Sequence, residues 1–229
     1  GRENVIMQRL FDIIFSGIAL LILAPLLVPI MILLRFTGEG EVFYVQQRVG
    51  ANGRMFGLLK FATMLKNSPN IGTGTVTVKN DPRVLPMGGF LRKTKINEMP
   101  QLINILVGDM SIVGPRPQDK RCFDVFPKDV QSEIVKVKPG LSGIGSIFFR
   151  DEEDLLHEVA NPTQFYDEVI APYKGALEKW YVNNATLTNY FLVIFVTAWV
   201  VIFPKSRIAW SVFKGLPVPP PDLRALASA

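Results

Sequence analysis

The most marked feature of the hydropathy pattern is a long apolar stretch near the start of the chain. Residues 13–34 carry no charged side chain, and about twenty apolar residues are enough for a helix to cross a bilayer. Pro25 and Pro29 fall inside the stretch, where each removes a helix hydrogen bond and favours a kink. Asp12 stands at its start and is costly in lipid unless it is paired or accepts from backbone amides.

Two interpretations of this stretch remain open from the pattern alone. One is a re-entrant helix, broken at the prolines, that leaves the membrane on the side it entered. The other is an ordinary spanning helix with a tolerated kink. Arg2 and Arg9 precede the stretch and Arg35 follows it, so the distribution of basic residues selects neither orientation.

A second apolar run, residues 190–203, is shorter than a comfortable span and predicts an interfacial or core helix that ends at Pro204. Trp199 and Trp210 suit the level of lipid head groups. The tail, residues 216–229, is rich in proline and predicts an extended or disordered segment.

The middle of the chain alternates short strand-like runs with turns. Residues 42–49 and 54–61 read as two strands of a hairpin joined by "GANG", and "TVTVKND" (75–81) reads as a brief strand. Helical spacing then predicts one helix over 91–108, ending at Gly108. The fold class expected is α/β, mostly helical with a small β-hairpin, divided into a membrane helix (1–36), a catalytic domain (37–215) and a tail (216–229).

Composition narrows the chemistry. The formal net charge is +5 and 48% of the 229 residues are hydrophobic, which favours an anionic partner and a membrane-associated protein. The single cysteine, Cys122, excludes an internal disulfide and predicts an inert thiol. The single histidine, His157, lies in an acidic run that reads as a solvated helix face, so Ser–His or Cys–His catalysis is not expected.

Several cations surround few acids in the middle of the chain. Arginine binds phosphate in a bidentate manner, and one carboxylate can share a magnesium ion with phosphate oxygens. A diphosphate site is therefore one interpretation, solvated surface charge is the other, and nucleic acid is disfavoured because no aromatic residues interleave with the cations. The residues that stand out are Lys60, Arg83, Arg92, Lys93, Glu98, Arg116 and Arg150, with Gly114 and Pro115 in a rigid turn before Arg116.

Four separate segments resemble the bacterial sugar transferase family of monotopic phosphoglycosyl transferases. "QRLFDIIFSGIALLILAPLLVPIMILL" is similar to the family's proline-broken membrane helix, and "VFYVQQRVGANGRMFGLLKFATM" to its "GPV-F-x-Q-x-R-x-G…KFRTM" segment. "LRKTKINEMPQLINILVGDMSIVGPRP" resembles the signature "LRRTSLDELPQLxNVLxGDMSxVGPRP", and "VKPGLSGIGS" resembles "KPGITGLAQV". The resemblance as a whole runs from about Gln8 to Thr188, which is most of the chain.

The resemblance implies a re-entrant helix in one leaflet and a catalytic domain on the cytosolic face of the bacterial inner membrane. It implies transfer of a sugar-1-phosphate from a UDP-sugar to undecaprenyl phosphate, with release of UMP. It also implies Mg²⁺, with Mn²⁺ as a substitute, held by Glu98. Inner-membrane lipids, further copies of the chain and downstream glycosyltransferases are the other partners expected, and nucleic acid is not.

The chain departs from the family pattern at its most consequential position. Asn97 stands where the family has its nucleophilic aspartate, and an amide is not an anionic nucleophile. Ala62 replaces a usual arginine, and Asn189 or Tyr190 stands where a late aspartate is usual. Three explanations follow: an introduced inactivating substitution, a natural variant with another attacking group or direct displacement by polyprenyl phosphate, and a pseudoenzyme. Several altered positions favour the natural variant.

The candidate site can therefore be set out by role. Catalytic roles are expected for Asn97, Glu98, Lys60, Arg92 and Arg116. Substrate binding is expected for Arg83, Lys93, Arg150, Gly114 and Pro115, and a membrane role for Asp12, Pro25 and Pro29. A non-catalytic membrane scaffold of glycan assembly is the alternative function.

Overall fold

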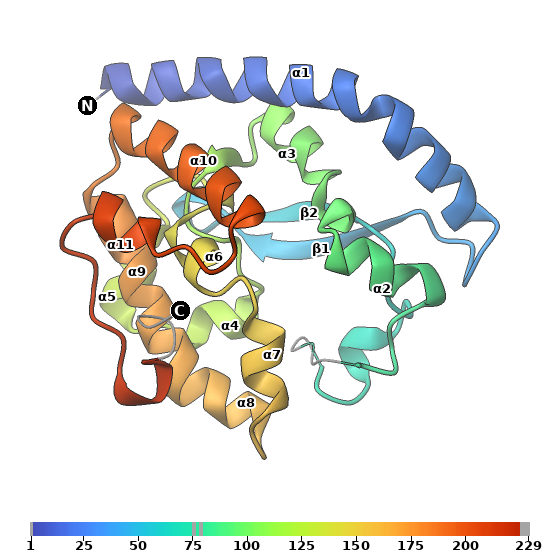
Figure 1. The fold of residues 1–229 in the computed structure, drawn as a ribbon. Coiled ribbons are helices and arrows are strands. Elements are labelled where there is room, and N and C mark those ends of the chain that lie inside the picture. Colours follow the sequence, from blue (N-terminus) through green and yellow to red (C-terminus); the bar gives the residue numbers. More distant parts are fainter. Residues whose placement is uncertain (1, 75–76, 78–79, 225–229) are drawn as a thin grey trace.

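The computed structural model describes residues 2–74, 77 and 80–224. The described part is mostly helical with two small two-stranded sheets, as expected for the fold class. Figure 1 shows one long helix, α1 (Arg2–Arg35), lying along one side of the molecule, with the other elements packed beneath it. The predicted strand at 75–81 falls mostly on residues outside the described part.

The predicted hairpin is confirmed. Strands β1 (Phe43–Val49) and β2 (Met55–Phe61) pair antiparallel, with Phe43 opposite Phe61 and Val49 opposite Met55. The link between them is a 3₁₀ turn (Ala51–Gly53) in which Asn52 has φ 56°, a left-handed conformation that asparagine tolerates better than most residues. Lys60 and Leu59 are thereby set on opposite faces of β2.

The single helix predicted over 91–108 is wrong. The chain forms α2 (Pro86–Lys93), a 3₁₀ turn (Ile96–Glu98) and α3 (Gln101–Val107). Lys95 takes φ 61° and turns the backbone out of α2, and Pro100 begins the next helix because its missing N–H is not needed there. The predicted end at Gly108 is confirmed, with φ 101°. Splitting the helix leaves the Asn97–Glu98 pair in a tight turn between two helices.

A second sheet was not foreseen. Strands β3 (Ser111–Val113) and β4 (Gly140–Ser142) pair in parallel and lie beneath α1, bringing the "GPRP" and "KPGLSG" segments together. The remaining helices are α4 (Lys120–Val125), α5 (Lys128–Ile134), α6 (Ile144–Phe148), α7 (Glu152–His157), α8 (Pro162–Phe165), a π-helical turn (Tyr166–Ile170), α9 (Ala171–Asn183), α10 (Leu187–Ile202) and α11 (Ile208–Val212), with short 3₁₀ turns at Ser68–Asn70 and Pro221–Leu223.

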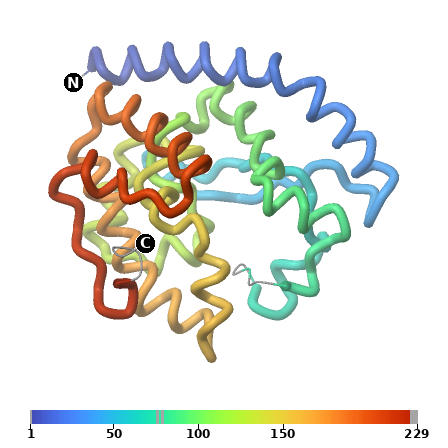
Figure 2. The backbone as a smooth tube through the Cα atoms, viewed as in Figure 1, coloured from blue at the N-terminus to red at the C-terminus, as the bar shows by residue number. Residues whose placement is uncertain are grey.

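The largest hydrophobic core lies among α4–α11, and the backbone path in Figure 2 shows these helices gathered on the side of the molecule below the start of α1. The proline-rich tail contributes to this core. Leu216 and Leu223 are buried in it, and the Tyr173 hydroxyl donates to the Pro217 carbonyl at 3.0 Å. The described part of the tail is therefore packed, whereas the sequence predicted an extended or disordered segment.

Helix α1 is fastened at its start by polar contacts. The Asp12 carboxylate, 2% exposed, accepts from the Ile112 backbone N–H at 3.0 Å and from the Tyr190 hydroxyl at 2.8 Å. Arg9 donates to the Ile105 and Leu106 carbonyls at the end of α3, where a helix leaves carbonyls without partners. These contacts meet the condition under which an acid is tolerated at this place, and Tyr190 is the inward-facing one of the two residues at the late-aspartate position.

The far end of α1 packs on the same body of protein. Leu27, Ile30 and Leu34 are buried against Phe61 of β2 and Leu91 of α2. The helix is continuous through Pro25 and Pro29, and its second half bends towards α2 (Figure 1). At 1.5 Å per residue, 34 residues are about 50 Å long, so α1 lies along the domain with both ends attached to it.

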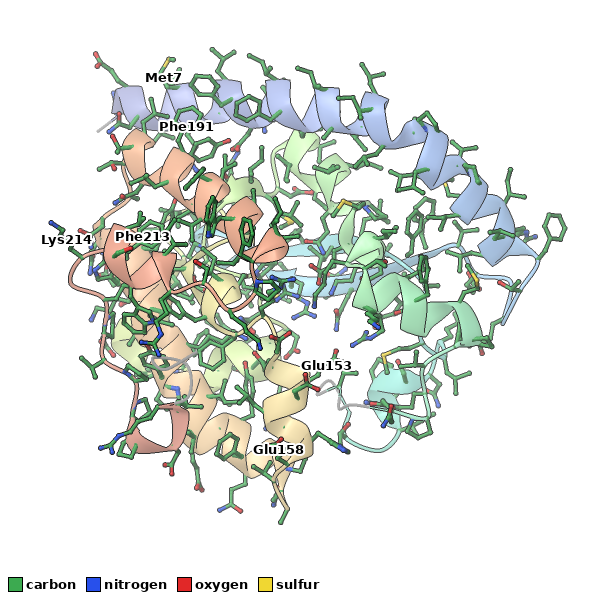
Figure 3. The ribbon with its side chains drawn as sticks, viewed as in Figure 1. Met7, Glu153, Glu158, Phe191, Phe213 and Lys214 are labelled. Carbon is green, nitrogen blue, oxygen red and sulfur yellow. The ribbon has the colours of Figure 1, made fainter. Side chains whose placement is uncertain are left out.

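The side of α1 that faces away from the domain is apolar and exposed. Its exposed residues include Val5, Leu10, Ile18, Leu21, Leu26 and Ile32. Helix α10 extends this surface with Phe191, Phe195 and Trp199, while its other side is buried. Phe191 stacks edge-on against Phe11 and Phe15 of α1, and Figure 3 shows Phe191 beside α1 near Met7. An exposed apolar surface that extends over two helices is typical of a membrane contact.

Candidate active site

Glu98 is the centre of a compact cluster of charges. Its Oε1 atom accepts from Arg116 Nη2 at 2.7 Å and lies 3.7 Å from Lys60 Nζ. The Glu98 and Lys60 side chains are only 13% and 16% exposed, so these groups are not solvated surface charges. Three of the five residues with expected catalytic roles are thus in contact, one from β2, one from the 3₁₀ turn and one from the turn after β3.

The pKa values of the cluster follow from burial and mutual attraction. Burial alone raises the pKa of Glu98, but Arg116 and Lys60 more than offset this and hold it well below its usual range. Burial, only partly offset by Glu98, lowers the pKa of Lys60 to about 7. The Glu98 carboxylate raises the pKa of Arg116. Glu98 is therefore ionised at neutral pH, and a carboxylate held by two cations is a weak base and a weak nucleophile.

The turn that carries Arg116 is fixed along its whole length. The Gly114 N–H donates to the Ser142 carbonyl at 3.0 Å, and the Gly140 N–H donates to the Pro115 carbonyl at 2.8 Å. A Cβ atom on Gly114 would overlap the Lys138 carbonyl, so only glycine permits this approach of the two segments. The expected rigid presentation of Arg116 by Gly114 and Pro115 fits this arrangement.

Asn97 is buried beside Glu98. It is 5% exposed, and its Oδ1 atom has no hydrogen-bond partner within the described residues. A buried amide oxygen without a donor is costly in a folded protein, and such atoms accumulate where a ligand or ion completes the structure. The Asn97 amide oxygen therefore has no donor among the described residues.

Arg92 lies at the edge of the cluster. It adds to the positive field that lowers the pKa of Lys60, and its guanidinium forms an ion pair with Glu153 of α7 and contacts the Met64 sulfur at 3.6 Å. The ion pair therefore joins α7 to α2 next to the charge cluster.

Three other cations expected to bind substrate have different surroundings. Arg83 is 4% exposed, bonds Asp81 through two atoms and donates to the Ser68, Ile71 and Gly74 carbonyls. Arg150 donates to the Val200 carbonyl of α10, and Lys93 is exposed at the end of α2. The structure does not bring these residues to Glu98, and their substrate-binding roles stay predictions.

Two charged residues near the cluster were missed by sequence reasoning. Arg48 of β1 donates to the Pro117 carbonyl at 3.2 Å and lies 3.8 Å from Asp119. Glu178 of α9, 1% exposed, accepts from the Arg116 backbone N–H at 3.1 Å. Glu178 is four residues after Lys174, which is also buried, and this spacing of charges on an otherwise apolar helix face is a signal the sequence does contain.

The side-chain oxygen atoms of Glu98 and Asn97 decide whether a divalent cation fits this site. The described residues contain no group of three or more His, Cys, Asp or Glu side chains that could hold a metal ion. Glu98 supplies one carboxylate, and the Oδ1 atom of Asn97 is a buried oxygen without a partner. Magnesium takes one or two protein oxygens when substrate phosphates and water supply the rest, so this donor set fits Mg²⁺ only together with a phosphorylated substrate.

The one cysteine and the one histidine of the chain lie in surroundings that do not suit a catalytic role. Cys122 is buried, and burial raises the pKa of its thiol, which disfavours the reactive thiolate. His157 is exposed at the end of α7, in agreement with a solvated helix face.

Comparison with known proteins identifies the family. A family model described as bacterial sugar transferase matches residues 3–204. The exopolysaccharide production protein ExoY of Rhizobium meliloti (strain 1021) is 35% identical over 172 residues, which are 69% of this chain and 76% of the relative. The chain belongs to the bacterial sugar transferase family.

Two larger relatives carry more specific names. The undecaprenyl-phosphate galactose phosphotransferase of Salmonella typhimurium is 33% identical over 215 residues, 88% of this chain and 41% of that protein. The UDP-glucose:undecaprenyl-phosphate glucose-1-phosphate transferase of Escherichia coli (strain K12) is 35% identical over 170 residues, 73% of this chain and 36% of that protein. The chain spans less than half the length of these two relatives.

Proposed function

We propose that this protein is a phosphoglycosyl transferase that moves a sugar-1-phosphate from a UDP-sugar to undecaprenyl phosphate and releases UMP. The reaction would start the assembly of an exopolysaccharide, O-antigen, capsule or glycoprotein glycan. The observation that carries the proposal is the cluster of Glu98, Arg116 and Lys60, which brings two of the family-like segments into contact. The named substrates of the Salmonella and Escherichia relatives support the choice of donor and acceptor.

The reaction proceeds by direct displacement in this proposal. A phosphate oxygen of undecaprenyl phosphate bonds to the sugar-bearing phosphorus while the bond from that phosphorus to the UMP oxygen breaks. Asn97 is not an anionic nucleophile, and the doubly paired Glu98 is a weak one, so a covalent phosphosugar on the protein is not required. Arg116 and Lys60 stabilise the charge that develops on the transferred phosphoryl group.

Magnesium would be held by Glu98 and the Asn97 oxygen together with the donor's phosphates. The ion would neutralise charge on the diphosphate. The chain's own residues orient the donor: Arg116 binds phosphate oxygens from its fixed turn, and Lys60 lies near the same Glu98 oxygen that Arg116 contacts.

The proposed location is the inner membrane, with α1 embedded in one leaflet and the domain on the cytosolic face. Both ends of α1 contact the same domain, which a helix that crosses the bilayer cannot do without burying the domain in lipid. The exposed apolar side of α1 and α10 would face the acyl chains. This arrangement favours the re-entrant or in-plane interpretation over the spanning one.

Accessibility labelling tests the location. The only native cysteine is buried, so a cysteine placed at exposed Glu3 or Thr37 reports on one end of α1 each. In sealed, right-side-out spheroplasts an impermeant maleimide should label neither position, and in inverted vesicles it should label both. Labelling of the two positions from opposite sides would exclude a one-leaflet arrangement.

A donor screen tests the activity. UMP release is measured with several UDP-sugars and undecaprenyl phosphate in the presence and absence of Mg²⁺. The matched control is Glu98→Ala, which should abolish release. Direct displacement predicts that both substrates must bind before UMP appears and that mass spectrometry finds no phosphosugar on the protein. Absence of UMP with every donor, equal for the protein and the control, would contradict the proposal.

The unusual Asn97 favours a second candidate, a pseudoenzyme that acts as a membrane scaffold for glycan assembly. The variant Asn97→Asp separates the two. A gain of activity of a hundredfold or more, from a baseline near zero, would point to an inactivated protein. Loss of activity, or no change from a measurable baseline, would support the asparagine mechanism.

A further inference from the structure

Glu178 is a buried acid that the proposed chemistry does not use. It lies on α9, and its side chain is enclosed by the glycine-rich segment after β4. A Cβ atom on Gly145 would overlap Glu178 Oε1, and one on Gly143 would lie 3.8 Å from Oε2. The two glycines therefore leave a space that the carboxylate fills.

The Glu178 carboxylate accepts hydrogen bonds from two backbone N–H groups. Oε1 accepts from the Arg116 N–H at 3.1 Å, and the Gly145 N–H donates to the same carboxylate. The Oε2 atom is buried and has no hydrogen-bond partner within the described residues. The nearest buried cation on α9, Lys174, is engaged by Glu152 at 2.6 Å, so Glu178 has no ion-pair partner at contact distance among the described side chains.

Such an arrangement is poor for stability. Burying a carboxylate without a contacting cation is costly, and an apolar side chain of similar volume would suit the core of α9 better. Burial raises the pKa of Glu178 to about 7, which is the signature of that cost. A buried acid that lowers stability is expected to have a functional role.

Glu178 contacts the backbone of Arg116, a member of the charge cluster. Glu178 holds the backbone N–H of Arg116, and the guanidinium of the same residue holds Glu98 at 2.7 Å. The other contacts of this turn are backbone bonds of Gly114 and Pro115, a bond from Gln118 Nε2 to the Arg116 carbonyl at 3.3 Å and the bond from Arg48 to the Pro117 carbonyl. Among the described residues, Glu178 is the side chain that accepts from the Arg116 N–H, next to the point where the Arg116 side chain departs.

We propose that Glu178 is a positioning residue, which holds the Arg116 backbone so that the guanidinium meets Glu98 and the phosphates of a nucleotide diphosphate-sugar. It does not touch the substrate and acts through Arg116 alone. The role in turnover rests on the proposed transferase function, whereas the effects on Arg116 and on phosphate binding do not.

Two variants of nearly equal size separate positioning from packing. Glu178→Gln keeps an oxygen that accepts from Arg116, and Glu178→Leu removes the acceptor but fills the space. Leu177→Ala, at the neighbouring buried position of α9, controls for a general loss of stability. All are assayed as the full chain in detergent micelles, below the melting temperature of the least stable variant.

Three readouts are compared. The Glu178→Leu variant should lose roughly tenfold to a hundredfold in kcat, as expected when a phosphate-binding group shifts by about 1 Å, with a smaller change in the KM for the donor. Glu178→Gln should stay within about threefold of the unmodified protein. The Arg116 amide should exchange its hydrogen faster in the leucine variant only, and pyrophosphate, the binding probe, should bind about tenfold more weakly there.

The outcomes are distinct. Equal kcat and pyrophosphate affinity in the leucine and glutamine variants would overturn the positioning role, as would an equal loss in Leu177→Ala. If the unmodified protein releases no UMP, the transferase proposal fails, while amide exchange and pyrophosphate affinity still decide the role of Glu178. Unchanged exchange of the Arg116 amide in Glu178→Leu would refute the inference on its own.

Discussion

The burial of Glu178 leads to a quantitative prediction about stability. In the unfolded chain its pKa is near the ordinary 4.5, and in the folded protein burial raises the pKa to about 7. An acid with a raised pKa binds more protons in the folded state, so it lowers stability as pH rises from about 4.5 to 7, and the full penalty is present above 7. A rise in pKa from 4.5 to about 7 corresponds to about 3 kcal/mol.

Glu178→Gln removes the ionisation and with it this penalty. At pH 8 the variant should be more stable than the unmodified protein by up to about 3 kcal/mol, or roughly 6–12 °C in Tm for a chain of this size. At pH 4.5 the electrostatic difference should fall to about 0.4 kcal/mol, because Glu178 is then protonated in the folded protein and half ionised in the unfolded chain. The charged or titratable groups that influence Glu178 are Arg116, Lys174 and Tyr181, and they are unchanged in the variant.

The assay is thermal unfolding in detergent micelles from pH 4.5 to 8.5, followed by circular dichroism. Glu158→Gln makes the same change of charge at an exposed position of the segment after α7 (Figure 3) and should leave the Tm within about 1 °C at every pH, as is usual for surface substitutions. A glutamine variant that is less stable at pH 8, or a gap that does not change with pH, would refute the electrostatic reasoning.

Further predictions concern the attachment of α1 and the packing of α2. Asp12→Leu leaves the Ile112 N–H and the Tyr190 hydroxyl without their acceptor and should lower the free energy of unfolding by about 1–3 kcal/mol for each group. Asp12→Asn keeps an acceptor and should lower it less. Equal melting temperatures of the two variants would contradict the role of these bonds. Gly88→Ala should lower the Tm because a Cβ atom would overlap the Thr63 carbonyl, whereas Gly89→Ala, with open space around it, should raise stability by about 0.5–1 kcal/mol; the melting temperatures of the two variants should therefore move in opposite directions.

Local patterns predicted the elements whose signals are local. Alternation and the "GANG" turn were enough for the β1–β2 hairpin, and the uncharged stretch was enough for α1. The prediction for residues 91–108 failed because the apolar spacing continues across Lys95, whose left-handed conformation has no signal in that spacing. The short parallel pairing of β3 with β4 joins segments far apart in the sequence and has no local signal.

The residues of the candidate site were predictable from the sequence only in part. Motif resemblance singled out Lys60, Glu98 and Arg116, and they meet in the structure. Counting cations also selected Arg83, whose guanidinium holds loop carbonyls, because sequence does not distinguish a phosphate ligand from a loop organiser. Glu178 was missed since its importance lies in a backbone amide 62 residues away.

The attachment of α1 at both ends has a mechanical consequence for a transferase that works on a lipid. Many membrane enzymes hang from a flexible tether, and their catalytic domain samples a range of heights above the bilayer. Here the helix and the domain form one solid piece, since Asp12 fastens the first half and Leu27, Ile30 and Leu34 fasten the second. In the proposed one-leaflet arrangement, the depth of α1 in the membrane would set the height of Glu98 above the lipid, and every acceptor phosphate would arrive at the same level.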